Sequence, residues 1–169
     1  MKTVSVKNRC RFSVAGKPAP HLEPIPSPGY VAAIPNQIPL IRPRLLVKPN
    51  ESVKVGTPLI EDKRNTHLKL LSPGGGEVAD IQYGPRRVIE AIVIKIAPDE
   101  PYIEFPVMDE TQIAEMQRDK LVDALMAQGL WPLIRGIPFK GIADPKDPPA
   151  AIWVPLDITD PFHPQSDIY

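Results

Sequence analysis

The chain has 169 residues, of which 43% are hydrophobic, so it is long enough for one ordinary domain with a buried core, or for one small domain and part of another. Its 20 Lys and Arg residues balance 20 Asp and Glu residues, which argues against a general nucleic-acid-binding protein because such proteins usually carry a basic excess. The single cysteine, Cys10, excludes an intrachain disulfide and an iron–sulfur cluster held by four cysteines of this chain. No apolar run approaches the roughly 18 residues of a transmembrane helix, and the first residues lack the apolar core of a secretory signal, so a cytoplasmic location is expected.

Proline is the most unusual feature of the composition. There are 23 prolines among the 169 residues, well above the usual share of about 5%. Because proline interrupts helices and central strands, this content predicts a short-stranded, loop-rich β fold with one substantial helix. Residues 1–16 alternate weakly and predict an entry strand, and residues 18–28 predict an extended, polyproline-like course. We therefore assign residues 1–29 to an extended, Pro-rich N-terminal segment.

Residues 30–107 contain several short β-rich runs separated by turn signals. Their spacing of roughly 8–12 residues is typical of a small barrel or sandwich. Two half-motifs, residues 48–59 and 72–81, resemble the core pattern of lipoyl/biotinyl-like domains, the barrel-sandwich hybrid, and the glycines at residues 74–76 are interpreted as a corner between two sheets. We predict this fold for residues 40–97. The predicted interior residues are Val53, Leu59, Val78, Ile81, Val88 and Ile92.

A lysine lies between the two half-motifs, where lipoyl and biotinyl carriers present a modified lysine on a hairpin tip. Here Lys63 falls only four residues after Leu59 and is followed by Arg64 and Asn65 rather than a small apolar residue. The Met-Lys-Met flanks of biotin carriers are absent as well. The favoured interpretation is a charged, solvated turn, and a lipoyl/biotinyl-like carrier or adaptor domain is the alternative function.

Residues 110–128 contain neither proline nor glycine and predict a helix. Asp109 and Gln112 have the spacing of a capping box at its start, and Gly129 is placed to end it. Residues 117–119 interrupt the apolar stripe, so two shorter helices are the alternative. The residues predicted to share one helix face are Ala114, Leu121, Val122, Leu125 and Met126.

Beyond this helix the sequence predicts a Pro-rich loop over residues 138–149 and a buried strand over Ala150–Val154. A buried strand followed only by a short tail favours the first strand of a further domain. We therefore assign residues 108–169 to a helix and the start of a truncated Rossmann-like domain. The predicted fold class is α+β and β-rich.

An ordered set of short motifs resembles one protein family. The set comprises Val14–Pro18, Arg42-Pro43, Glu61–Asn65, Ser72-Pro73 with Gly76, Arg86–Val88, and the Gly-Leu-Trp run that begins at Gly129 and extends to Phe139. In this order they resemble the N-terminal part of the A subunit of the sodium-translocating NADH:quinone oxidoreductase. The resemblance covers roughly residues 10–160, and the family protein continues with a Rossmann-like domain and further β structure.

The resemblance implies one component of a complex that oxidises NADH, reduces quinone and pumps sodium ions. The A subunit of that family is peripheral, lies on the cytoplasmic side of the bacterial inner membrane and carries no cofactor of its own, whereas flavins and iron–sulfur centres sit in the partner subunits. The single cysteine and the lack of a Gly-x-Gly-x-x-Gly fingerprint agree with this expectation. The C subunit of the Rnf complex and the flavin-binding subunit of respiratory complex I have related architecture, but their flavin loop is not evident here, so FMN binding is not expected.

The family has been associated with the quinone-reaction end of the complex, and three residues are candidates for that surface. Trp131 and Phe139 supply aromatic planes and Arg135 supplies a cation, which together suit a planar ring and its carbonyl oxygen. The alternative is that Leu130, Trp131 and Phe139 simply pack the helix end against the barrel. No catalytic set is predicted, and no metal site, because the three histidines, at positions 21, 67 and 163, are scattered.

Overall fold

The computed structural model describes residues 15–16, 21, 23–38 and 40–154. Ser27–Pro148 form one compact unit. The described residues on either side of this unit, within 15–26 and 149–154, belong to no helix or strand and are exposed. Apart from residues 15–16, the predicted entry strand lies outside the described residues.

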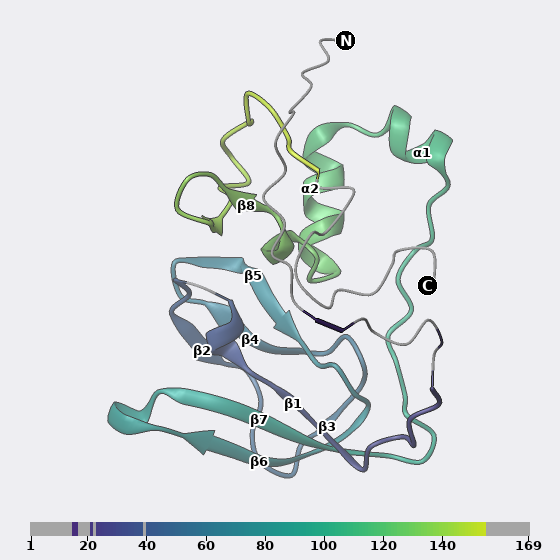
Figure 1. The fold of residues 1–169 in the computed structure, drawn as a ribbon, viewed down its shortest axis with the longest axis vertical. Coiled ribbons are helices and arrows are strands. Elements are labelled where there is room, and N and C mark those ends of the chain that lie inside the picture. The colour runs from purple at the N-terminus through teal and green to yellow at the C-terminus, as the bar shows by residue number, and fades with distance from the viewer. Residues whose placement is uncertain (1–14, 17–20, 22, 39, 155–169) are drawn as a thin grey trace. The chain divides into compact units, whose positions relative to one another are not determined.

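Two small antiparallel sheets make the body of the unit, as the β-rich pattern predicted (Figure 1). The four-stranded sheet has the order β1 (Tyr30–Ala33), β7 (Ile89–Ile96), β6 (Gly76–Tyr83) and β3 (Ser52–Val53). The three-stranded sheet has the order β2 (Pro43–Leu45), β4 (Pro58–Asp62) and β5 (Asn65–Leu71). Short 3-10 turns, η1 (Pro35–Gln37) and η2 (Pro85–Arg87), lie in the connections.

The hydrophobic core fills the space between these sheets. Five of the six predicted interior residues are buried, namely Val53, Leu59, Val78, Ile81 and Ile92. The prediction for Val88 is wrong, since 46% of Val88 is exposed whereas Ile89 is 7% exposed. The reason is a bulge: Gln82 pairs with Ala91 but Tyr83 pairs with Ile89, so the inward alternation of β7 shifts by one residue before Ile92.

The glycine run forms the predicted sheet corner. A Cβ atom at Gly75 would collide with the backbone of Pro101, and one at Gly76 would collide with the carbonyl oxygen of Lys95. Both contacts are with backbone atoms, which cannot rotate away as a side chain can. The run therefore allows two backbone segments to approach closely where the chain enters β6.

Two carboxylates at the end of β4 are buried, although acidic residues seldom are unless they are paired. Glu61 accepts a hydrogen bond from Arg44 across the β2–β4 ladder and forms an ion pair with it. Asp62 Oδ1 accepts the backbone N–H groups of Arg42 and Arg64, each at 3.1 Å. These contacts tie the short edge strand β2 to the β4–β5 hairpin.

The helical region divides into α1 (Glu110–Glu115) and α2 (Arg118–Ala127), which confirms the two-helix alternative. The capping box of α1 is confirmed: the Gln112 N–H donates to Asp109 Oδ1 at 2.8 Å, and the Asp109 N–H donates to Gln112 Oε1 at 3.0 Å. Helix α2 ends as predicted at Gly129, whose φ of 69° is left-handed. The Leu130 N–H then reaches back to the Leu125 carbonyl oxygen at 2.9 Å, as in a Schellman motif.

Helix α2 packs on β5 and forms a second, smaller hydrophobic cluster (Figure 1). Its buried members are Leu68, Val122, Met126 and Trp131. The predicted helix face is thus correct for α2, where Leu121 and Leu125 are also partly buried. It is wrong for Ala114, which is exposed in α1, because the break before α2 takes α1 out of that stripe.

The end of the described chain differs from the prediction. After η3 (Trp131–Leu133), the strands β8 (Arg135–Gly136) and β9 (Gly141–Ile142) pair as a small hairpin. The strand predicted over Ala150–Val154 is not formed; these residues are irregular and exposed, and no described strand pairs with them to satisfy their backbone groups. No helix in the described part of the chain is long and apolar enough to cross a bilayer.

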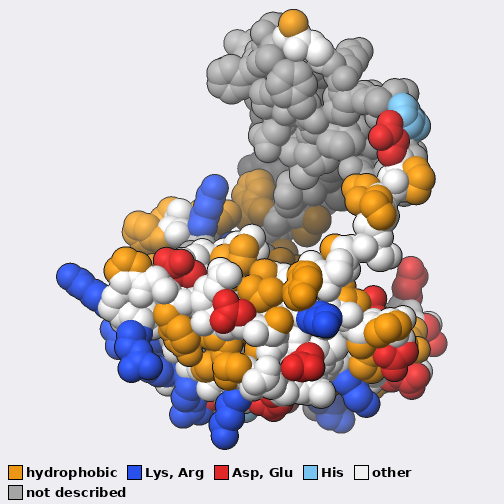
Figure 2. Space-filling view, turned by 90° about the horizontal axis from the view of Figure 1, so that it is seen from below, with side chains coloured by type: hydrophobic (Ala, Val, Ile, Leu, Met, Phe, Trp, Pro, Cys, Tyr) orange, Lys and Arg blue, Asp and Glu red, His pale blue; other side chains and the backbone are white. Residues whose placement is uncertain are grey.

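The surface carries both signs of charge, in keeping with the balanced composition. Figure 2 shows acidic and basic side chains on the same face, with Lys and Arg side chains gathered along its edge and hydrophobic side chains between them. This face therefore does not present the extended basic field of a general nucleic-acid-binding surface.

Candidate functional site

Trp131, the first of the three candidate residues, is buried at 6% exposure beneath the end of α2. Its ring packs in the cluster with Leu68 of β5 and Met126 of α2. Its indole Nε1–H donates to the Ala143 carbonyl oxygen at 2.9 Å, so the polar edge of the ring is satisfied. Trp131 therefore fastens the β8–β9 hairpin to α2 and to the barrel.

The other two candidates lie on the hairpin itself. Arg135, in β8, is half-buried, and its Nη1 atom is buried without a hydrogen-bond acceptor among the described residues. A buried guanidinium N–H that lacks an acceptor carries a desolvation cost of about 1–3 kcal/mol or more. Phe139 lies between β8 and β9 and is 89% exposed, and its neighbour Ile137 is exposed as well.

The structure thus separates the three residues by exposure. Trp131 faces inward, in agreement with the packing alternative, whereas Phe139 faces outward and does not pack the helix end against the barrel. Arg135 lies on the same hairpin as Phe139, and its buried Nη1 finds no acceptor among the described residues. The hairpin therefore carries an exposed aromatic ring and a buried hydrogen-bond donor, and Trp131 holds the segment after it through the hydrogen bond to Ala143.

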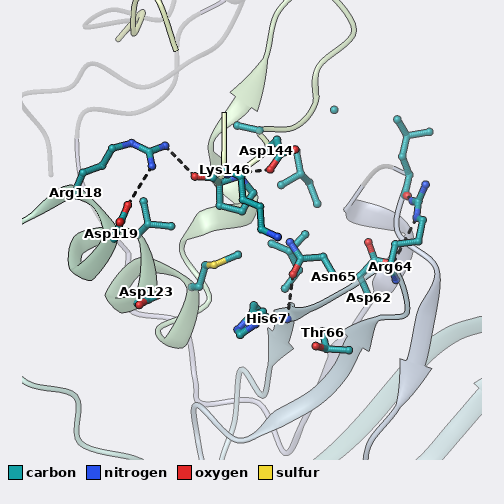
Figure 3. Close-up of a pocket in the computed structure, with 18 residues that line it drawn as sticks. Asp62, Arg64, Asn65, Thr66, His67, Arg118, Asp119, Asp123, Asp144 and Lys146 are labelled. Atoms are coloured by element: carbon teal, nitrogen blue, oxygen red, sulfur yellow. Dashed lines mark hydrogen bonds and ion pairs between the residues drawn. The ribbon is translucent and has the colours of Figure 1, made fainter. Parts of the chain in front are cut away.

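A larger feature, a cleft of about 960 Å³, lies between the β4–β5 hairpin, α2 and the segment that follows β9 (Figure 3). Its floor is apolar and includes Leu68, Val122 and Ile142. Figure 3 shows the ionisable groups of its walls: α2 and the segment after β9 contribute Arg118, Asp119, Asp123, Asp144 and Lys146, and the β4–β5 hairpin contributes Asp62, Arg64 and His67. Clefts of this size are the usual location of small-molecule sites.

Several polar contacts in this cleft hold its walls together. Arg118 Nη2 donates to the Pro145 carbonyl oxygen at 2.9 Å, and Arg118 Nη1 lies 3.6 Å from Asp119 Oδ1. Asp144 Oδ1 accepts the Lys146 N–H at 2.9 Å, which shapes the loop after β9. Among the described residues, no group of three or more His, Cys, Asp or Glu side chains is placed to hold a metal ion. His163 lies outside those residues.

Two known family models match this chain, one over the barrel and one over the region that contains α2 and the β8–β9 hairpin. Residues 4–97 match the model of the NqrA N-terminal barrel-sandwich hybrid domain, and residues 116–169 match the model of the NqrA second alpha/beta domain. The first match alone spans more than half of the chain. The chain belongs to the NqrA family. The predicted barrel-sandwich hybrid and the predicted family resemblance are therefore both confirmed.

Curated relatives in this family are named as the A subunit of Na(+)-translocating NADH-quinone reductase. The relative from Photorhabdus laumondii is 33% identical over 165 residues, which are 98% of this chain and 37% of the relative. The relative from Klebsiella pneumoniae is 34% identical over 149 residues, 88% of this chain and 33% of the relative. The relative from Pseudomonas aeruginosa is 30% identical over 94% of this chain. The chain thus spans about a third of the length of the NqrA proteins it matches.

The cleft of about 960 Å³ is lined by residues of both matched domains. The β4–β5 hairpin belongs to the first matched domain, and α2 with the β8–β9 hairpin belongs to the second. Sequence reasoning missed this cleft and the buried pair of Glu61 and Asp62. The sequence did contain a signal for the buried pair: two adjacent acids follow apolar residues of a predicted strand, and arginines at 42, 44 and 64 can pair with them. Acidic residues that are buried are usually paired in this way.

Proposed function

We propose that this chain forms part of the peripheral, cofactor-free NqrA component of a sodium-translocating NADH:quinone reductase, on the cytoplasmic side of the bacterial inner membrane. The names of the relatives support the complex, and the matched domains support the NqrA component. In this proposal, flavins and iron–sulfur centres belong to partner subunits. The contribution of this chain is to assembly and to the quinone-reaction end.

Arg135 is the observation that carries the quinone assignment. Its buried Nη1–H is a donor without an acceptor among the described residues, on a hairpin that also exposes Phe139. A quinone carbonyl oxygen supplies an acceptor, and an exposed aromatic ring supplies a surface for the planar ring. Trp131 acts in this proposal as a positioning residue that holds the hairpin in place.

The test is made in the complete complex, with substitutions in the full-length NqrA protein. Arg135→Ala and Phe139→Ala are expected to raise the KM for quinone, by roughly tenfold for the lost charged hydrogen bond, or to change inhibitor sensitivity. NADH oxidation by an artificial acceptor that bypasses quinone is expected to remain unchanged.

Two matched variants control for general effects of lost charge and lost apolar surface. Lys120→Ala removes an exposed cation from α2, and Leu133→Ala removes an exposed apolar side chain from η3. Both are expected to leave quinone kinetics unchanged. Wild-type quinone kinetics and inhibitor sensitivity in Arg135→Ala and Phe139→Ala complexes would remove the quinone assignment and leave the assembly role.

The carrier alternative is favoured by one observation. Lys63 lies exposed in the two-residue turn between β4 and β5, the hairpin tip at which lipoyl and biotinyl carriers present their lysine. Intact-mass measurement on protein from its native host separates the two functions. The NqrA proposal expects an unmodified Lys63, and a lipoyl or biotinyl mass increase on this residue supports the carrier.

A further inference from the structure

A second concave feature lies on the barrel and includes Lys63 at the β4–β5 turn. It is a groove of about 550 Å³ between the segment that follows β1, the β4–β5 turn and the end of η2. Apolar side chains make most of its lining, including Ile38, Leu40, Ile41 and Val88, and two proline rings and one asparagine add to it. The two charged groups of the described lining are both cations, Arg42 and Lys63.

The positive charge of this groove is not neutralised by the acids nearest in sequence. Glu61 is paired with Arg44, and Asp62 is buried and occupied by backbone N–H groups and by Arg64, whose Nε lies 3.8 Å from its Oδ1. Within the described residues, neither Arg42 nor Lys63 takes part in an ion pair. A concave apolar wall with one sign of charge concentrates the field at its mouth.

The groove is also held in shape before any ligand arrives. The Lys63 N–H donates to the Arg42 carbonyl oxygen at 2.9 Å, so the backbones that carry the two cations are joined across the β2–β4 edge. The Arg64 side chain donates to the Leu40 carbonyl oxygen, which fastens one apolar wall to the same turn. Such preorganisation reduces the ordering cost of binding.

We infer that this groove binds an amphipathic organic anion, with its apolar body against Ile38, Ile41 and Val88 and its carboxylate or phosphate at Arg42 and Lys63. The volume lies within the usual range of about 300–1,000 Å³ for small-ligand sites. A preponderance of apolar lining with a few polar groups that fix orientation is the usual composition of such sites. The inference goes beyond the proposed function and does not depend on it.

The experiment titrates the 169-residue chain with octyl phosphate, octanol and inorganic phosphate by calorimetry, below the concentration at which octyl phosphate forms micelles. Octyl phosphate is expected to bind at least tenfold more tightly than either octanol or inorganic phosphate, because only it satisfies both halves of the groove. Lys63→Ala is expected to weaken octyl phosphate binding by roughly tenfold and to leave octanol binding unchanged. Lys54→Ala, which removes an exposed lysine outside the groove, is the matched control.

The outcomes are distinct. Equal affinity for octanol, equal affinity for inorganic phosphate, or an equal loss in Lys54→Ala and Lys63→Ala would each overturn the inference. Because Lys63 is exposed at a turn, its replacement is expected to leave the fold intact, and an unchanged unfolding temperature verifies this. Co-sedimentation with phosphatidylglycerol vesicles identifies the source of the ligand: binding that needs Lys63 indicates a membrane lipid, and binding of the monomeric amphiphile alone indicates a soluble anion.

Discussion

The barrel and the helix–hairpin region, residues 110–142, bury their apolar side chains to different degrees. Among the described residues, the barrel core contains ten buried ones, and Leu59, Val78, Ile92 and Ile94 have no exposed surface at all. The second cluster has four buried members, each retaining 6–9% exposure, and one of them, Leu68, belongs to β5 of the barrel. The barrel core consists of barrel residues alone, whereas the smaller cluster of the helix–hairpin region also needs Leu68 from β5 of the barrel.

This difference predicts that the two regions open with different ease. The barrel strands are joined by antiparallel ladders that run along most of β4–β5 and β6–β7, with bulges in each, so local opening there breaks many contacts together. The β8–β9 hairpin has only two residues in each strand and carries the exposed Phe139. Segments with few buried contacts open most easily, and these are the segments from which binding surfaces are usually drawn.

The largest expected effect comes from Trp131→Ala, which tests whether the helix–hairpin region depends on one anchor. Removal of the buried ring and its hydrogen bond to Ala143 is expected to lower the free energy of opening of this region by about 3–5 kcal/mol. Hydrogen exchange is expected to accelerate across α2 and the hairpin and to remain slow in β6 and β7. Equal acceleration in the barrel would show that the two regions unfold as one.

The reciprocal test is Ile92→Ala in the barrel. Ile92 is fully buried between the sheets, so its truncation is expected to cost about 2–5 kcal/mol of the free energy of unfolding, measured by urea denaturation. Val88→Ala, four residues earlier on the exposed side of the bulge, is expected to change that energy by less than about 0.5 kcal/mol. Comparable losses from the two variants would contradict the shifted alternation of β7.

Sequence reasoning was most successful in the barrel, because local patterns there decide the structure. Glycine corners and apolar alternation predicted the fold and most of its interior. It failed at Val88, because a bulge adds one residue to one strand and the sequence around Glu90 carries no glycine or proline to mark it. Val88 and Ile89 are both apolar, so the local sequence does not show which of them faces the core.

The candidate site was harder to predict, because its residues are sorted by long-range packing. Trp131 and Phe139 have similar apolar character, and only the position of β5 beneath α2 makes one buried and the other exposed. The same limit applies to Ala150–Val154, whose apolar sequence predicts a strand although a strand also needs a partner. The cleft between the two matched domains arises from pairs of distant segments, which local periodicity does not report.

A smaller effect is expected from Gly129→Ala, which tests the junction between α2 and the hairpin. The left-handed φ of 69° costs an alanine about 1–2 kcal/mol, and its Cβ atom would lie 2.9 Å from Leu71 of β5. The loss is expected in the opening energy of α2, measured by hydrogen exchange. Gly29→Ala is the matched control, because a Cβ atom there meets nothing within 4 Å, and it is expected to be nearly neutral.

The smallest expected effect comes from Asp109→Ala, which removes the capping box of α1. The lost cap is worth about 1 kcal/mol, and Glu115→Ala in the same helix, which leaves the cap intact, is the control. Because α1 buries none of its residues, this loss is expected as faster amide exchange over residues 110–115 and not as a change in the global unfolding midpoint. A lowered global midpoint in Asp109→Ala, with Glu115→Ala unchanged, would mean that α1 unfolds with the cooperative unit rather than opening on its own.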